Sequence, residues 1–195
     1  MKLKLLLWID GPLYFSMAYH LQQMIDCDIY AIIDVTNQPK NFYIDQKLVK
    51  FKKIWFFHDN IKNIHTPDIE YLASFEKKYD IDIWKIAINE RLFYNYYNYY
   101  KFSSEEILSI EEDCCKLFEN IFDNVQPDIV LAYTPNHHHS ELFYKFVQAK
   151  QIRILILSNP MIGYKSRISE NREILDTHEN FKMIDGSNRD FSEMR

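Results

Sequence analysis

One stretch decides the fold: PDIVLAYTPNHHHSELFY, residues 127–144. It predicts a buried strand over residues 128–133, a short polar turn, and a helix over about residues 136–150. In a parallel α/β sheet, residues that follow the carboxyl end of a strand face the crevice where ligands bind. The sequence therefore predicts that three imidazoles lie at the functional edge of an α/β sheet.

Other apolar runs predict the rest of the sheet, because short continuous runs are typical of parallel strands buried on both faces. Four further strands are expected at residues 3–9, 28–35, 53–57 and 153–157. Helices are expected over residues 13–25, 66–79 and 82–97 and after the capping box at Ser103, while residues 36–49 form a polar connection. Right-handed crossovers then give a Rossmann-like three-layer sandwich with a parallel five-stranded sheet in the order 3-2-1-4-5.

Length and composition limit the class of protein. The 195 residues, 47% of them apolar, suffice for one domain over residues 1–164, followed by a polar tail or linker over 165–195. A net charge of −5 without a long basic run argues against a nucleic-acid partner. No segment reaches the roughly 18 apolar residues of a membrane span. The three cysteines have no metal-like spacing, so we expect a reduced, cytoplasmic protein.

The histidines are the candidate catalytic residues. His139 shares a helical face with Leu142 and Phe143 and should point inward, and His138 should lie nearer the open crevice. Either could be a general base, the usual role of a neutral imidazole near pH 7. Consecutive helical residues point about 100° apart, so the three rings should not converge on a metal ion, and none is expected. The alternative is that these are merely solvated residues of a first helical turn.

Further candidate binding residues follow the first and fourth strands. They are Asp10, Gly11, Pro12, Thr134, Asn136 and His137. A helix that begins at Gly11 offers free N–H groups to an anion, although a tight turn also explains Gly11. A single glycine lacks the G-x-G-x-x-G pattern, so no dinucleotide cofactor is expected, even with Asp34 at the end of the second strand.

Glu90 lies on the apolar stripe of the expected helix over residues 82–97. A buried carboxylate must be paired or functional, so Glu90 is either ion-paired, with Arg91 or Lys53 in reach, or a substrate contact. The charge run from Glu105 to Asp113 is expected to be a solvated helix face.

Four phrases, LLLWIDGP, CDIYAIIDV, PDIVLAYTPNHHHSELFY and RILILS, resemble the N-terminal half of surface- or capsular-polysaccharide biosynthesis proteins with a GT-B glycosyltransferase fold. The resemblance covers about residues 1–165. It implies an acceptor-binding domain whose cleft is lined by Gly11 and by His138 or His139. The substrates would be a carbohydrate acceptor and a nucleotide-sugar donor, with no cofactor.

The same resemblance implies that the donor site belongs to a missing C-terminal domain or a partner subunit, and it allows a peripheral position at a membrane. Two alternatives stay open. One is a non-catalytic α/β module that binds a nucleotide or a protein. The other is a domain like those of sugar-nucleotide epimerases, which have similar architecture.

Overall fold

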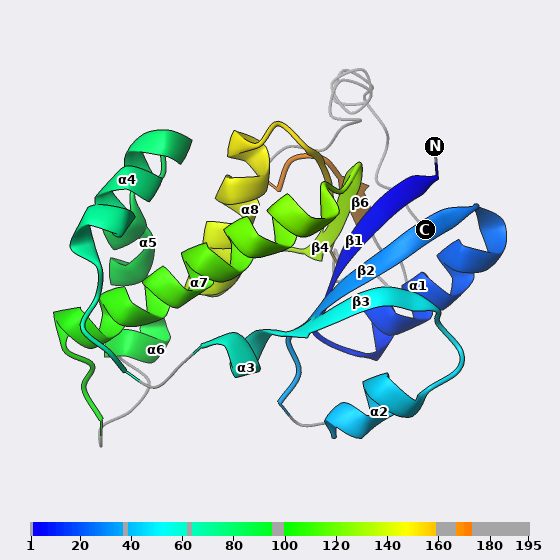
Figure 1. Cartoon of the computed structure of the whole chain (residues 1–195), viewed down its shortest axis with the longest axis horizontal. Coiled ribbons are helices and arrows are strands. Elements are labelled where there is room, and N and C mark those ends of the chain that lie inside the picture. Colours follow the sequence, from blue (N-terminus) through cyan, green and yellow to red (C-terminus); the bar gives the residue numbers. More distant parts are fainter. Residues whose placement is uncertain (1, 37–38, 62–63, 95–99, 159–166, 173–195) are drawn as a thin grey trace, which may run out of the picture.

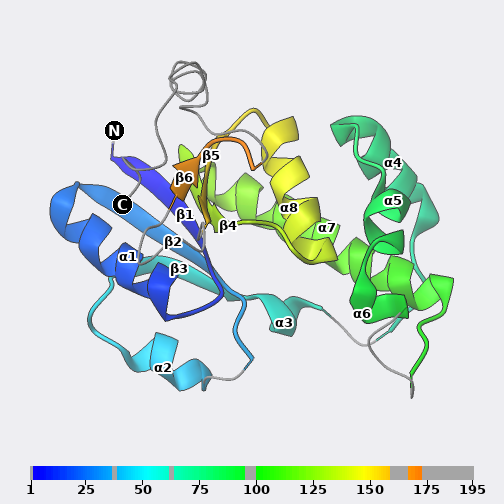
Figure 2. The same cartoon turned by 180° about the vertical axis from the view of Figure 1, so that it is seen from behind.

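The computed structural model describes residues 2–36, 39–61, 64–94, 100–158 and 167–172. Within these ranges six strands form one sheet in the order β3-β2-β1-β4-β5-β6, shown in Figures 1 and 2. The first five strands are parallel, and β6 pairs antiparallel with β5. The strands are β1 Leu3–Ile9, β2 Cys27–Ile33, β3 Phe51–Phe56, β4 Ile129–Tyr133, β5 Arg153–Ser158 and β6 Arg167–Ser169.

The predicted order of the five parallel strands is confirmed, but the predicted number of strands is wrong. The added strand, β6, falls inside the expected polar tail and places its Ile168 opposite Leu157 of β5. With only three residues, β6 is too short to stand out as an apolar run. Apart from residues 167–172, the expected tail over residues 165–195 lies outside the described residues.

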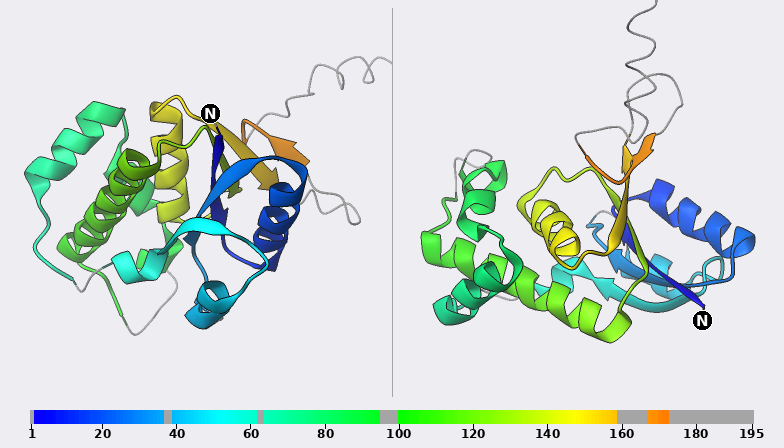
Figure 3. Two further views of the ribbon diagram at one scale, coloured as in Figure 1. Left: turned by 45° about the vertical axis from the view of Figure 1, so that its right-hand side comes forward. Right: turned by 90° about the horizontal axis from the view of Figure 1, so that it is seen from above.

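Helices cover both faces of the sheet (Figure 3). Helix α1 packs against β1 and β2 on one face, whereas α8 packs against β5 on the other and contacts α7. None of the described helices has the length and apolar character needed to cross a membrane. The helices are α1 Pro12–Met24, α2 Lys40–Asp45, α3 Phe57–Asn60, α4 Ile69–Tyr79, α5 Ile83–Ile88, α6 Arg91–Tyr94, α7 Ser104–Val125 and α8 His138–Ala149.

Several predicted helix limits are wrong. Helix α4 begins at Ile69 rather than near Thr66, because the side chain of Asp68 accepts the Tyr71 N–H at 2.9 Å and caps the first turn. The predicted helix over residues 82–97 is two short helices, α5 and α6, and residues 95–99 lie outside the described residues. The expected polar connection contains α2, and α3 follows β3 directly.

Trp8, at the carboxyl end of the central strand β1, organises the core on the α7–α8 face. It is fully buried, and its ring centroid lies 4.8 Å from that of Phe143 in α8 and 5.9 Å from that of Phe118 in α7. The ring centroids of Phe57 and His139 lie 5.6 and 5.8 Å from that of Trp8. One indole therefore joins the sheet to three helices just beneath the edge where ligands are expected.

Helix α7 is covered on more than one side, so the expected solvated face is wrong for Glu111, Glu112 and Asp113, which are buried, whereas Glu105 is exposed. Helices α4 and α5 contact α7 on the side that faces away from the sheet (Figure 1), and His138 of α8 lies against Glu111. Glu112 shows how such an acid is accommodated, since its carboxylate accepts the backbone N–H of Asp68 at 2.6 Å. The acids of α7 therefore hold neighbouring elements and do not simply face water.

The capping box of α7 gives a first prediction. Ser103 Oγ accepts the Glu106 N–H at 3.2 Å, and the Glu106 carboxylate accepts the Ser103 N–H at 2.7 Å. We expect Ser103→Ala to lower the free energy of unfolding by about 1 kcal/mol in urea denaturation. Ser104→Ala, one residue further on, is the control and should change it by less than about 0.5 kcal/mol. Equal losses at both positions would contradict the capping role.

Candidate functional site

The loops that follow β1 and β4 are neighbours at the carboxyl edge, because these two strands pair in parallel. Gly11 caps α1 with an extended backbone and no side-chain hydrogen bond. Among the described residues, nothing lies within 4 Å of a Cβ placed on Gly11, so the backbone there is open to approach. Beside it, loss of hydration raises the pKa of Asp10, and the charge of Asp34 adds to that effect.

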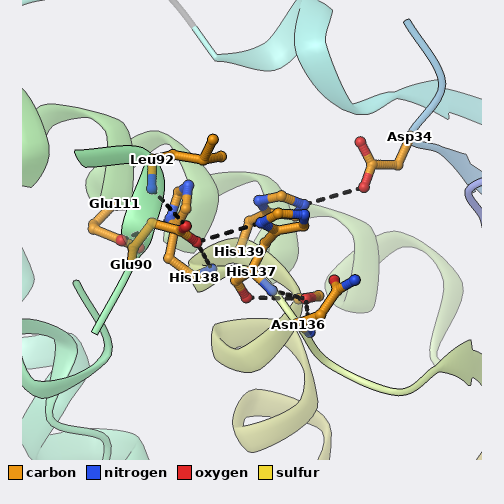
Figure 4. A network of polar contacts seen from close by, with 9 residues as sticks. Asp34, Glu90, Leu92, Glu111, Asn136, His137, His138 and His139 are labelled. Atoms are coloured by element: carbon orange, nitrogen blue, oxygen red, sulfur yellow. Dashed lines mark hydrogen bonds and ion pairs between the residues drawn. The ribbon is translucent and has the colours of Figure 1, made fainter. Parts of the chain in front are cut away.

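Three imidazoles and two acids lie along this edge in a group that we call the edge row: His58, Asp34, His139, His137 and Glu90. Asp34 lies between two rings, with Oδ1 3.0 Å from His58 Nε2 and Oδ2 3.1 Å from His139 Nε2. The rings of His139 and His137 stack with centroids 5.6 Å apart, and His137 Nδ1 lies 3.6 Å from Glu90 Oε2. Figure 4 shows the row from Asp34 to Glu90.

Asp34 is the most strongly perturbed acid of the row. Burial raises its pKa, but the contacts with His139 and His58 outweigh burial and bring the pKa well below its ordinary value. Trp8 also donates its indole N–H to Oδ2 at 3.1 Å. Asp34 is therefore an ionised carboxylate whose negative charge is shared among three ring N–H groups from three other elements.

His139 points inward, as predicted, and is only 8% exposed. Its ring lies between Trp8 and Phe57, at centroid distances of 5.8 and 4.7 Å. Burial lowers its pKa more than Asp34 raises it, so the ring is neutral near pH 7. Because Asp34 is ionised and can only accept, the proton of neutral His139 lies on Nε2.

Glu90 is buried, as predicted, but its partners are not Arg91 or Lys53. Its carboxylate accepts the backbone N–H of His138 at 2.6 Å and that of Leu92 at 2.9 Å. It thus joins the first turns of α8 and α6, where helices have unpaired N–H groups. Burial raises the pKa of Glu90, but these hydrogen bonds outweigh it and lower the pKa, which keeps the carboxylate ionised.

The first turn of α8 is fixed by Ser140 as well as by Glu90. Ser140 Oγ accepts the backbone N–H of His137 at 3.1 Å and donates to the His137 carbonyl at 2.9 Å. His137 therefore occupies the N-cap position with a defined backbone. Its side chain is 36% exposed, unlike those of the two histidines that follow.

The His138 ring lies edge-to-face against that of His139, with centroids 5.0 Å apart, and its Nδ1 is directed toward α7. Its Nδ1 lies 2.7 Å from Glu111 Oε1, and its ring centroid lies 4.6 Å from that of Phe93. Burial lowers its pKa, but the contact with Glu111 and the negative charges of Glu90 and Asp34 together outweigh burial and raise the pKa overall.

A pocket of about 450 Å³ lies between α5 and the start of α8. Four of the predicted site residues line it: Glu90, Asn136, His137 and His138. Lys85, Lys145 and Arg172 bring positive charge to its wall, and Asp82 and Glu141 bring negative charge. The other predicted residues, Asp10, Gly11, Pro12, Thr134 and His139, are not among its lining residues. The residues predicted to form one site therefore lie in two regions of the structure, the pocket and the edge beside β1.

His58 was missed by the sequence prediction. It lies in α3, two residues after the end of β3, and its side chain is 48% exposed. Its position was the available signal, because His58 comes one residue after the predicted strand over residues 53–57. That strand pairs with the strand after which Asp34 comes, so His58 and Asp34 could be expected at the same edge. No protein-family model, curated protein or solved structure matches this chain.

Asp34 gives the second prediction. We expect Asp34→Asn to lower the free energy of unfolding at pH 7 by about 2 kcal/mol, since hydrogen bonds to a charged group are lost. Because the folded pKa lies below the ordinary value of 3.8, the contribution is complete above that value and is lost as the pH falls toward the folded pKa. The difference between the two proteins in urea denaturation should therefore shrink below about pH 4.

The control for this measurement is Asp59→Asn. Asp59 pairs with Lys40 on the surface, and both side chains are about half exposed. Such a pair contributes less than about 1 kcal/mol. A loss at Asp59 as large as that at Asp34, or a loss at Asp34 that does not change with pH, would contradict the account of the row.

Proposed function

We propose that this chain is the acceptor-binding part of a sugar-transfer enzyme that uses a nucleotide-sugar donor, and that His137 is its general base. One observation carries the proposal. The half-exposed imidazole of His137 lines the pocket, while the ionised carboxylate of Glu90 lies 3.6 Å behind its Nδ1. The sequence resemblance to GT-B polysaccharide enzymes supports the class of substrate, and the sheet with helices on both faces is compatible with their Rossmann-like N-terminal domain.

The pocket has the size and the lining that a carbohydrate needs. Its volume of about 450 Å³ falls within the range usual for small-molecule sites. Asn89 and Asn136 offer amide donors and acceptors, Lys85 offers ammonium donors, and Glu141 offers carboxylate acceptors. Sugar hydroxyls both donate and accept, so this mixed lining suits them better than it suits an apolar ligand.

In the proposed reaction an acceptor hydroxyl donates a hydrogen bond to His137 Nε2, because Nδ1 faces Glu90. The hydroxyl oxygen attacks the anomeric carbon of the donor while its proton passes to Nε2. The bond from that carbon to the diphosphate oxygen breaks, and the nucleoside diphosphate leaves with the electron pair. Glu90 stabilises the imidazolium that forms, and its two backbone hydrogen bonds keep it ionised for that role.

The sequence alone favoured His138 or His139 as the base. In the structure both residues are only 8% exposed, and each ring faces a carboxylate inside the protein. A base must reach the hydroxyl proton either directly or through one water molecule. His137 meets that requirement at the pocket wall, so we place the role on His137.

The donor would be held by a second α/β unit, as the resemblance implies. The open edge at Asp10 and Gly11 would face that unit, because the N–H groups at the start of α1 suit an anion such as a diphosphate. A non-catalytic module that binds a nucleotide or a protein is the alternative. It is favoured by the internal use of two of the three adjacent histidines.

The third prediction tests His137 against His58, which also has a carboxylate partner but does not line the pocket. Saturation-transfer NMR with a panel of monosaccharides and nucleotide sugars should show a carbohydrate signal that His137→Ala weakens and His58→Ala preserves. With the donor-holding unit present, His137→Ala should lower kcat by roughly 10²–10⁴-fold, the usual contribution of a positioned base.

Three outcomes would contradict the proposal. Signals from nucleotides without any carbohydrate signal would favour the non-catalytic module. An equal loss of the carbohydrate signal in His137→Ala and His58→Ala would show that binding does not depend specifically on the pocket. Near-normal turnover by folded His137→Ala would exclude His137 as the base.

A further inference from the structure

Three side chains with metal-ligand chemistry meet in the core below the pocket: Glu111, Cys114 and His138. Glu111 and Cys114 are three residues apart on α7 and therefore lie on one face of that helix. His138 is the first residue of α8, which packs against α7. The candidate ligand atoms of the three residues all lie within 4.8 Å of one another.

The group is buried and only partly satisfied. Glu111 and Cys114 are fully buried, and His138 is 8% exposed. Although His138 Nδ1 and Glu111 Oε1 are 2.7 Å apart, among the described residues neither Glu111 oxygen nor His138 Nδ1 has a hydrogen bond of acceptable geometry. A buried carboxylate in this state costs several kcal/mol unless a cation balances it. A protonated His138 supplies part of that charge, but it leaves the second Glu111 oxygen without a hydrogen-bond partner among the described residues.

We propose that Glu111, Cys114 and His138 bind a zinc ion that joins the middle of α7 to the first turn of α8. Imidazole nitrogen, thiolate sulfur and carboxylate oxygen are the three kinds of ligand that zinc takes in proteins, whereas magnesium and calcium prefer oxygen alone. A neutral imidazole, a thiolate and a carboxylate together balance the two positive charges of the ion, so the loaded site carries no net charge into the core.

The surroundings suit such an ion. His138 also lines the pocket, which gives the ion a path from solvent, and Phe93 covers the His138 ring at a centroid distance of 4.6 Å. On binding, the Cys114 thiol loses its proton to solvent and its sulfur lone pair forms the bond to zinc. With three protein ligands, a water molecule would complete the four-coordinate site. The ion would have a structural role, because it fixes the start of the helix that follows His137. This role does not depend on sugar transfer.

The fourth prediction uses Co²⁺ as a spectroscopic probe of the full chain after metal removal. Wild type should bind one equivalent, with a thiolate-to-cobalt charge-transfer band and the visible bands of four-coordinate Co²⁺, and Zn²⁺ should abolish both. Cys114→Ser should lose the thiolate band. Cys115→Ser is the matched control, since Cys115 is equally buried and adjacent but outside the group, and it should keep the band.

Two further measurements keep the test decisive if a core variant folds poorly. The double variant Cys27→Ser with Cys115→Ser leaves Cys114 as the single thiol of the chain and should keep the band. Zn²⁺ should raise the Tm of wild type and of Cys115→Ser but not that of His138→Gln, with folding checked by circular dichroism. If the wild type shows no thiolate-to-cobalt band, or if the band survives Cys114→Ser, the proposed zinc site is wrong.

Discussion

The carboxylate of Asp34 is the group on which the carboxyl edge of the sheet depends. It ends β2, yet it receives the indole N–H of Trp8 from β1, faces His58 after β3, and accepts from His139 in α8. A buried ionised acid is tolerated only when such donors surround it, so each of these elements is constrained by the same charge. The positions of His139 and, through ring stacking, of His137 follow from it.

The three adjacent histidines have different surroundings at this edge. His139 and His138 direct their ring nitrogens to internal carboxylates and lie among aromatic rings, so their polarity is used within the fold. His137 keeps a half-exposed ring because its backbone is held by Ser140 and because Glu90, itself held by two N–H groups, lies behind it. The adjacent histidines thus differ in their surroundings, because His137 is the N-cap residue of α8 and His138 and His139 belong to its first turn.

The sequence predicted the features that local pattern controls. The apolar runs located the five parallel strands, and their order followed from chain connectivity, which placed His137 beside the loop at Gly11. Contacts between distant residues were not predictable in this way. Glu111 was expected to face solvent because nothing in its own helix shows that α8 begins beside it, with His138 Nδ1 2.7 Å from its carboxylate. Glu90 appeared to need a cation, whereas the structure gives it two backbone N–H groups that exist only where α6 and α8 begin.

The most direct test is a crystal structure with a carbohydrate that binds in solution, because it locates the ligand relative to His137 and His58, the two most exposed side chains of the edge row. We expect a sugar in the pocket between α5 and α8, with one hydroxyl oxygen roughly 2.6–3.2 Å from His137 Nε2. Glu90 should keep its place behind the ring. A sugar bound beside His58, with His137 free of ligand, would exclude His137 as the base.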